Sequence, residues 1–486
     1  MTFLLFQINW KITSMIEFIL NNQYIQTNQS AGSTALDFVR YHRHLYGTKI
    51  GCREGDCGAC TVLVGELRQG KLRYQSMTSC LMPLGNANGK HLVTIEGLNM
   101  ENLSPVQASI VEEGGTQCGF CTVGFVMSLT GFLLDEKAPT FVEAVAAMDG
   151  NICRCTGYKS LERAAATLVE QLKNRPKKRI VEWLVENHFL PVCFLGIEER
   201  LKQLPDVQPA GIQPNGQFVF LGGGTDLFVQ RAEEMPESNS QHLFDWQDLK
   251  GIYERNGNCY IGASSTVGDL QQSLLLQRIF PRLGAFLKLV SSTPIRNMGT
   301  LAGNLANASP IGDLTIFFLA LDSTLVLNHF GESRTLPLRH FYKSYKKTDL
   351  KKGEYIESLY FKIPESQDFF NFEKVSKRIH LDIASVNSAC LLNVKNGLIK
   401  KAYLSTGGVG PIPFYLGRSS AALEGKPVNE ETLKAVNEVI QEEISPISDA
   451  RGSADYKRLL LRQLFYAHFL KWFPGLIDLE ELVSKS

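Results

Sequence analysis

The sequence predicts a multidomain α+β protein. Its 486 residues are enough for about three domains. Eight of its eleven cysteines lie in the first third of the chain, and two glycine-rich loops follow in the middle third. Strand-like and helical segments both occur throughout. These observations predict cysteine-rich domains first, then larger α+β domains built around the glycine loops.

The first four cysteines have the spacing of a plant-type ferredoxin. Four residues separate the first pair, two separate the next pair, and nineteen precede the last cysteine. That spacing is typical of [2Fe–2S] ligation. Glycines in the same segment allow the loop to turn its N–H groups toward the sulfurs of an anionic cluster. The predicted ligands are Cys52, Cys57, Cys60 and Cys80; the glycines are Gly51, directly before the first cysteine, and Gly55 and Gly58 within the loop.

The residues before this quartet predict the rest of its domain. The segment 16–24 has strand-like apolar spacing, interrupted by a turn at Asn21-Asn22, and 34–46 is typical of a helix. We expect a strand-rich, half-open barrel crossed by one helix.

A second quartet has a different pattern, CxxC followed by CxC: Cys118, Cys121, Cys153 and Cys155. The first pair opens an apolar helical stretch through Leu134, and the second pair precedes a helix that starts near Ser160. Helix N-termini favour negative charge and lower a thiol pKa, as an iron ligand requires. The pattern predicts a second cluster held between two pairs of helices.

Zinc and disulfides are the alternatives to iron. CxxC with CxC could form a tetrahedral zinc site, and eight cysteines could form four bridges. Disulfides fit less well, because the chain is large and apolar enough to fold without them and has no secretion signal. We interpret Cys193, Cys259 and Cys390 as core thiols.

Three motifs carry a family resemblance: GCREGDCGACTV, QCGFCTVGF and GNICRCTGY. They resemble the tandem [2Fe–2S] domains of the xanthine dehydrogenase and molybdenum hydroxylase family, and all eight ligand positions match. Val123 stands where the family usually has proline. Valine is less pre-organised than proline for the start of a helix, but the replacement removes no ligand.

Composition excludes several classes of function. The formal net charge is +1, which argues against nucleic-acid or acidic-membrane binding. No stretch has the apolar length of a membrane span, and the N-terminus lacks a cleavage site, so we expect a cytoplasmic protein. Because Met15 directly precedes the first predicted strand, residues 1–14 are assigned no function.

A domain boundary is predicted near Arg179. The basic, proline-broken segment 174–179 is typical of a linker. Helical segments then run over 180–204, and the proline-rich 205–216 follows before a strand that begins at Phe218.

The first glycine loop follows that strand. Residues 218–221 predict a strand, 222–226 a tight loop, and Leu227 the start of a helix. Such a loop presents amides and a hydroxyl to phosphate oxygens. Alone the signal is weak, because triple glycine is commonly a simple turn and the GxGxxG spacing of a Rossmann site is absent.

The second glycine-rich region strengthens this prediction. Small residues, hydroxyls and amides alternate over 293–297, 299–304 and 308–313. That composition suits a backbone lying against a long, flat, polar ligand, although two consecutive glycine turns would have the same composition.

Both loops resemble the flavoprotein domain of the same family, and the resemblance implies FAD on a two-lobed fold. It assigns Val219, Phe220, Leu221, Gly222, Gly223, Gly224, Thr225 and Asp226 to the pyrophosphate, Thr300, Leu301, Ala302, Gly303 and Asn304 to a second wall, and Asp313 to a third contact. Lys374 matches a family lysine that reaches the flavin; a solvated surface lysine is the alternative.

The last third continues as strands over 384–394 and 399–406, joined by an Asn396-Gly397 hairpin turn. Helices are predicted over 429–443 and 453–472. SDARGSADYKRLLLRQL resembles the family's C-terminal domain, so the resemblance covers nearly the whole chain from Met15.

The resemblance thus implies four consecutive domains. They are a plant-type [2Fe–2S] ferredoxin β-grasp domain (15–100), an all-α [2Fe–2S]-binding helical bundle (101–179), a two-lobed α+β FAD-binding domain, not Rossmann, with its linker (180–365), and a C-terminal α+β domain like that of CO dehydrogenase flavoproteins (366–486).

The resemblance also implies the function. In the family, a molybdenum–pterin centre on a larger domain hydroxylates the substrate, and electrons pass through both clusters to FAD. No segment here corresponds to that domain, so we expect a separate large subunit and a hetero-oligomer. Clusters followed by flavin on one chain resemble the small subunit of split xanthine dehydrogenases, which implies NAD⁺ as the acceptor. The helical quartet is expected nearer molybdenum. The cysteines are ligands, and no catalytic residue is predicted.

Three alternatives stay open at this stage. An aldehyde- or N-heterocycle-oxidising relative would use the same relay. A stand-alone flavin and iron–sulfur reductase would need no molybdenum partner. A non-catalytic, zinc-stabilised binding protein would contain zinc and no flavin.

Overall fold

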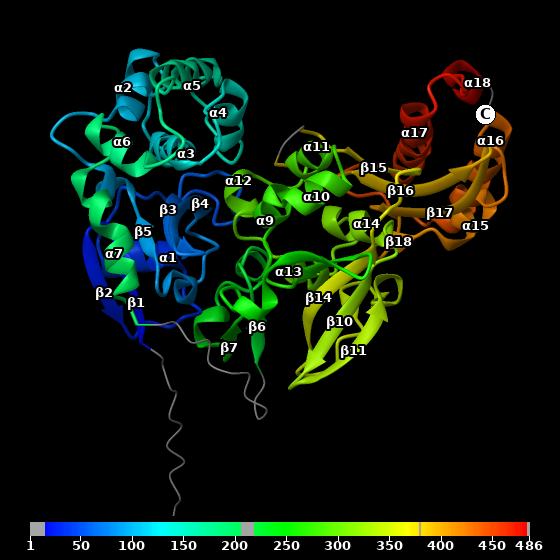
Figure 1. The fold of residues 1–486 in the computed structure, drawn as a ribbon, viewed down its shortest axis with the longest axis horizontal. Coiled ribbons are helices and arrows are strands. Elements are labelled where there is room, and N and C mark those ends of the chain that lie inside the picture. The colour runs from blue at the N-terminus through cyan, green and yellow to red at the C-terminus, as the bar shows by residue number, and fades with distance from the viewer. Residues whose placement is uncertain (1–14, 206–217, 379–380, 484–486) are drawn as a thin grey trace, which may run out of the picture. The chain divides into compact units, whose positions relative to one another are not determined.

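A computed structural model describes residues 15–205, 218–378 and 381–483 (Figure 1). The chain divides into two compact units: 1–208 with 227–240, and 209–226 with 241–486. Residues 1–14, and the proline-rich segment 205–216 from residue 206 on, lie outside the described residues.

The first unit begins with a five-stranded sheet. Its order is β2-β1-β5-β3-β4, with β1 and β5 parallel and the other neighbours antiparallel. Thr34 caps a short helix, α1 (Ala35–Asp37), which continues as one π-helical segment to His42 and packs Phe38 against Phe18. The predicted strand-rich domain with one helix is confirmed. The strands are β1 (Ile16–Leu20), β2 (Gln23–Thr27), β3 (Thr61–Arg68), β4 (Lys71–Thr78) and β5 (His91–Val93).

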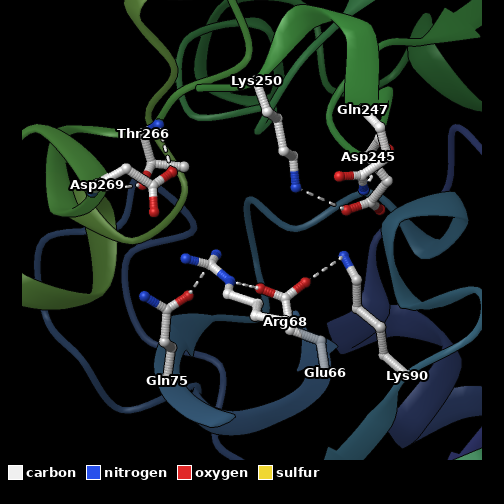
Figure 2. A network of polar contacts seen from close by, with 9 residues as sticks. All are labelled: Glu66, Arg68, Gln75, Lys90, Asp245, Gln247, Lys250, Thr266 and Asp269. Atoms are coloured by element: carbon white, nitrogen blue, oxygen red, sulfur yellow. Dashed lines mark hydrogen bonds and ion pairs between the residues drawn. The ribbon is translucent and has the colours of Figure 1, made fainter. Parts of the chain in front are cut away.

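A charged network lies on this sheet (Figure 2). Glu66 is 8% exposed, contacts Arg68, and lies 3.7 Å from the Lys90 ammonium. Arg68 also donates to the Gln75 side chain at 3.1 Å. Two cations therefore offset one largely buried carboxylate, as burial of a charge requires.

Four helices form the second part of this unit: α2 (Pro105–Glu112), α3 (Thr122–Leu134), α4 (Phe141–Ala147) and α5 (Lys159–Gln171). Ser104 and Gln107 form a capping box that starts α2. Ten of the thirteen residues of α3 are buried, because this helix packs against the other helices and the sheet. The predicted helical domain is confirmed.

The segment after Arg179 packs with the first unit, beyond the predicted boundary. It contains α6 (Ile180–Glu186) and α7 (Ile197–Lys202). Leu184 joins the core of the helical domain, and Leu201 packs with Ile19 of β1. These apolar residues are buried against the iron–sulfur part, and the first compact unit accordingly includes this segment.

The second unit contains a five-stranded antiparallel sheet in the order β11-β10-β14-β9-β8. Figure 2 also shows two polar contacts of this unit: the Thr266–Asp269 capping box of α9, and Lys250 at 3.5 Å from Asp245. The strands are β8 (Ile252–Arg255), β9 (Asn258–Gly262), β10 (Thr324–His329), β11 (Glu332–Pro337) and β14 (Tyr355–Lys362); β6 (Val219–Leu221) pairs with β7 (Ser240–His242), and β12 (Tyr342–Ser344) with β13 (Lys347–Thr348).

Short helices cover one face of this sheet, and their apolar residues share a core with β9, β10 and β14. They are α9 (Val267–Gln272), α10 (Leu274–Ile279), α11 (Leu283–Lys288), α13 (Leu301–Ala306) and α14 (Asp313–Leu319); α12 (Thr293–Arg296) stands between α11 and α13 in the chain. The second glycine-rich region thus forms α12, α13 and the start of α14.

A four-stranded sheet, β15-β16-β17-β18, ends the chain with its helices. Asn396 and Gly397 adopt positive φ, as the predicted hairpin turn requires. The elements are β15 (Asp368–Val375), β16 (Val386–Lys395), β17 (Leu398–Gly407), β18 (Phe414–Tyr415), α15 (Gly417–Leu423), α16 (Glu430–Glu443), α17 (Ala454–Trp472) and α18 (Leu479–Val483). Within the described ranges, no helix combines the length and the apolar character needed to cross a membrane.

Candidate iron–sulfur and flavin sites

The ferredoxin quartet is assembled as two pairs of thiols. The loop before β3 carries three of the cysteines, and Cys80 follows β4. Cys57 donates to Cys52, and Cys80 to Cys60. Backbone N–H groups of Glu54 and Cys57 also point at the Cys52 sulfur, at 3.3 and 3.4 Å. Each iron of a [2Fe–2S] cluster is bound by two thiolates. The two pairs, Cys52 with Cys57 and Cys60 with Cys80, therefore fit such a cluster.

Hydrogen bonds within the first quartet lower the pKa of one thiol in each pair. The hydrogen bond from Cys57, with backbone N–H groups, lowers the pKa of Cys52 to about 5. The hydrogen bond from Cys80 likewise lowers the pKa of the Cys60 thiol, although burial opposes it. The same contacts raise the pKa of the partner thiols Cys57 and Cys80, so each pair contains one sulfur that releases its proton more readily than the other.

The second quartet also forms two pairs. The sulfurs of Cys118 and Cys155 lie 3.7 Å apart and are exposed, whereas Cys121 contacts the buried Cys153. Thr156 Oγ1 lies 3.1 Å from the Cys153 sulfur. The four thiols thus form one exposed pair and one pair that includes a buried sulfur.

The helix-dipole expectation is wrong for Cys121. This residue precedes α3, yet burial raises the pKa of its thiol to about 12, because desolvation of the anion outweighs the helix terminus. Across the described residues, no three histidine, cysteine or acidic side chains converge as one metal ion would require. The paired thiols suit a two-iron cluster.

A buried junction joins the two cysteine loops. The Ile152 N–H donates to the Cys57 carbonyl at 3.0 Å, and Asn151 Nδ2 donates to the Gly58 carbonyl at 3.2 Å. Ser128 Oγ donates to Asn151 Oδ1 at 2.7 Å. A Cβ at Gly124 would lie 2.2 Å from the Gly58 carbonyl oxygen, so glycine is required for this approach. The junction fixes both quartets to one another within the first unit.

The glycine loop after β6 lies against the second predicted loop. A Cβ at Gly222 would lie 2.8 Å from Thr300 Oγ1, and one at Gly223 would lie 1.8 Å from the Met298 carbonyl oxygen. Gly224 has a φ of 84°. The structure therefore brings the two loops together through backbone surfaces that only glycine permits.

The second loop offers polar groups to a ligand. Thr300 caps α13 and accepts from the Gly303 N–H at 3.1 Å. In the described part of the chain, the buried Asn304 Oδ1 has no hydrogen-bond partner. A buried polar atom without a partner is costly, and a bound polar ligand would satisfy it. Both loops fit a dinucleotide with a pyrophosphate.

Asp313 and Lys374 form a buried ion pair. Lys374 Nζ lies 2.7 Å from Asp313 Oδ2 and donates to the Leu289 carbonyl at 2.6 Å. Its side chain is 2% exposed, so the surface-lysine alternative is wrong. Asn387 of β16 donates to Asp313 Oδ1 at 2.6 Å. Strands of the C-terminal sheet thus hold the start of α14, and Asn387 is a site residue that sequence analysis did not select.

Asp226 has partners that sequence reasoning also missed. Its Oδ1 accepts from Asn307 Nδ2 at 2.5 Å, and Lys346 donates to Asn307 in turn. Burial raises the pKa of Asp226, against the opposing charge of Lys346. No local motif marks Asn307, which follows α13, or Lys346, which lies in the β12–β13 turn. These residues are brought to Asp226 by tertiary contacts.

The remaining predicted residues lie around these loops. Phe220 packs against Tyr355 with ring centroids 5.5 Å apart, and Leu221 and Leu301 are buried. Of the three cysteines predicted in the core, Cys259 and Cys390 are buried and Cys193 is partly exposed.

Comparison with known families matches four domains in the predicted order. Residues 18–85 match the 2Fe-2S iron–sulfur cluster binding domain, and 94–166 the [2Fe-2S] binding domain. Residues 201–366 match the FAD binding domain in molybdopterin dehydrogenase, and 371–472 the CO dehydrogenase flavoprotein C-terminal domain. Fold and site together define an iron–sulfur flavoprotein, an oxidoreductase with two [2Fe–2S] domains and one FAD domain.

Sequence similarity to curated relatives covers almost the whole chain. Xanthine dehydrogenase of Emericella nidulans is 28% identical over 96% of this chain and 39% of its own length. Xanthine dehydrogenase/oxidase of Rattus norvegicus is 28% identical over 97% of this chain and 40% of its own. The chain thus spans about two fifths of these curated relatives. It belongs to the molybdenum hydroxylase family and is homologous to the N-terminal region of xanthine dehydrogenases.

One solved structure agrees in fold with about half of the chain. Reconstituted CO dehydrogenase from Oligotropha carboxidovorans has a TM-score of 0.50 and 23% identity, covering 53% of this chain and 90% of that chain. Quinoline 2-oxidoreductase from Pseudomonas putida 86 has a TM-score of 0.49 and 25% identity over the same shares.

Proposed function

We propose that this chain is the electron-transfer subunit of a xanthine dehydrogenase. It would pass electrons from a molybdenum centre on a large partner subunit through both clusters to FAD and on to NAD⁺. The overall reaction would convert xanthine, NAD⁺ and water to urate and NADH. The observation that carries this proposal is the similarity to xanthine dehydrogenases over 96% of the chain, with all four domains in the same order.

The residues of the chain would bind and position the cofactors. When bound, clusters of this kind carry single electrons and a flavin can collect two and release a hydride. The paired thiols of each quartet would hold one iron per pair. The glycine loops would hold the pyrophosphate, and the Asp313–Lys374 pair would fix the start of α14 beside it. We assign no catalytic residue to this chain.

The helical quartet is the proposed point of electron entry. The exposed sulfurs of Cys118 and Cys155 support this order, because electrons from a partner must reach a cluster close to the surface. Substitutions of exposed residues beside them, such as Phe120 (47% exposed), are therefore expected to weaken partner binding.

Purification of the chain with its partner from the native source tests this function. We expect a large molybdenum-containing subunit to co-purify, and xanthine to drive NADH formation and bleach the flavin. A chain that oxidises NADH alone and never co-purifies with a large subunit would support the stand-alone reductase instead.

Aldehyde or N-heterocycle oxidation is a second candidate. Aldehyde oxidase 1 of Macaca fascicularis is 25% identical over 98% of this chain, so the electron-transfer part alone does not select the substrate. Assaying the purified complex with xanthine, an aldehyde and an N-heterocycle distinguishes them. The zinc-stabilised binding protein is not supported, because both cysteine domains match [2Fe–2S] families.

A further inference from the structure

A small hairpin reaches the predicted flavin loops. Its strands β12 and β13 pair Tyr342 with Thr348 and Ser344 with Lys347, which leaves Tyr345 and Lys346 at the turn. The Tyr342 hydroxyl is buried and donates to the Leu305 carbonyl of α13 at 3.2 Å. The hairpin is therefore anchored to the helix that begins at the second glycine loop.

Ion pairs at the base of the hairpin fix it further. Arg334 of β11 lies 2.7 Å from Asp349 and 2.8 Å from Glu354, and Lys343 lies 2.9 Å from Asp349. The Asp349 N–H donates to the Phe341 carbonyl at 2.8 Å. The turn is thus presented by a braced element.

From this turn, the Lys346 side chain binds Asn307. Its Nζ donates to the Asn307 carbonyl at 2.8 Å and to Asn307 Oδ1 at 2.7 Å. Asn307 Nδ2 then donates to Asp226 Oδ1 at 2.5 Å. One lysine side chain therefore connects the end of α13 to the end of the first glycine loop.

The backbone of Lys346 indicates that this side chain matters. Its φ is +57°, in a turn position where glycine or asparagine is normally preferred. A lysine with this φ strains the backbone. The contacts with Asn307 are the compensating interaction.

The charge of Lys346 would matter at a dinucleotide site. Asp226 is a largely buried carboxylate at the end of a loop proposed to receive a pyrophosphate, and two anions close together repel. The Lys346 ammonium is the cation that acts on Asp226. Without it, binding of the pyrophosphate would have to overcome the Asp226 charge.

We propose that Lys346 is a positioning residue of the flavin site: through Asn307 it holds the Asp226 end of the glycine loop, and its charge offsets that carboxylate when FAD binds. This inference rests on the proposed flavin loops.

Titration of the full-length apoprotein with FAD, followed by flavin fluorescence, tests it. We expect Lys346→Met to weaken FAD binding about tenfold, the scale of one charge-assisted hydrogen bond. The matched control is Lys347→Met on the same hairpin, also exposed, which should bind FAD as the wild type does. Lys346→Gly relieves the backbone strain, so it should keep the thermal stability and still lose FAD affinity.

A double-mutant cycle separates charge from structure. In an Asp226→Asn background, Lys346→Met should change FAD affinity less than twofold, because no carboxylate remains to offset. Equal affinities for Lys346→Met and Lys347→Met would overturn the inference, and so would wild-type affinity in Lys346→Gly. If the wild-type apoprotein binds no FAD, the proposed flavin site itself fails, and this inference fails with it.

Discussion

The buried Asp313–Lys374 ion pair predicts how much one contact contributes to the stability of the second unit. Lys374→Met would leave the Asp313 carboxylate buried with only neutral partners, and an uncompensated buried charge costs about 3–5 kcal/mol. We expect that loss in denaturant unfolding, together with weaker FAD retention. The double variant Asp313→Asn with Lys374→Met should be more stable than Lys374→Met alone. Lys352→Met, at an exposed lysine, is the control; a similar loss there would contradict the ion-pair argument.

His468 predicts how the stability of this unit depends on pH. Burial lowers the pKa of this fully buried imidazole to about 4, from an ordinary 6.5. Its ring contacts Asn371 at 2.9 Å and Ser388 at 3.1 Å, which suits the neutral form. Because the unfolded chain takes up the proton first as pH falls, the contribution of His468 is complete above pH 6.5 and declines toward pH 4.

The measurement compares the wild type with His468→Gln by thermal unfolding followed through flavin release. Their difference in unfolding free energy should shrink by about 3 kcal/mol between pH 7 and pH 4. His340→Gln, at an exposed histidine, should show no such change. A difference that stays constant across this range would contradict a neutral buried His468.

At the scale of elements, the loop after β6 predicts a strict glycine requirement. Gly223→Ala would place a Cβ 1.8 Å from the Met298 carbonyl oxygen, so the loop or α12 must shift. Such overpacking costs about 1–3 kcal/mol, and we expect flavin content to fall with it. Gly284→Ala in α11 meets open space and should be neutral or slightly stabilising. Equal flavin content in the two purified variants would show that the loop tolerates a side chain.

The same elements show how far local sequence signals reach. The cysteine loops, the Asn396-Gly397 turn and α17 follow from spacing and turn chemistry that lie within a short segment. The helix predicted over 34–46 ends instead at His42. The predicted boundary near Arg179 differs from the division into compact units. The reason is that apolar residues of α6 and α7 pack against residues that are distant in the sequence. Lys374 was selected only through the family resemblance, and its ion pair with Asp313 and the contacts of Lys346 could not be predicted for the same reason.

At the scale of the molecule, the cofactor residues divide between the two units. All eight predicted cysteine ligands lie in the first unit. The predicted flavin residues lie in the second: those up to Asp226, with Thr300–Asn304, Asp313 and Lys374. Each set is held by contacts inside its own unit, so loading of the clusters and loading of the flavin should be separable.

Cys153→Ser tests that separation. Cys153 is paired with Cys121 in the second quartet, and replacing a thiolate there should release that cluster, lowering iron from about four to about two atoms per chain. Flavin content should not change, because the glycine loops belong to the other unit. Paramagnetic resonance of the reduced protein should retain the ferredoxin-type signal. Cys193→Ser, at a partly exposed cysteine outside both quartets, should keep all the iron. Loss of flavin together with iron in Cys153→Ser would show that the two units load their cofactors as one, against the division seen in the contacts.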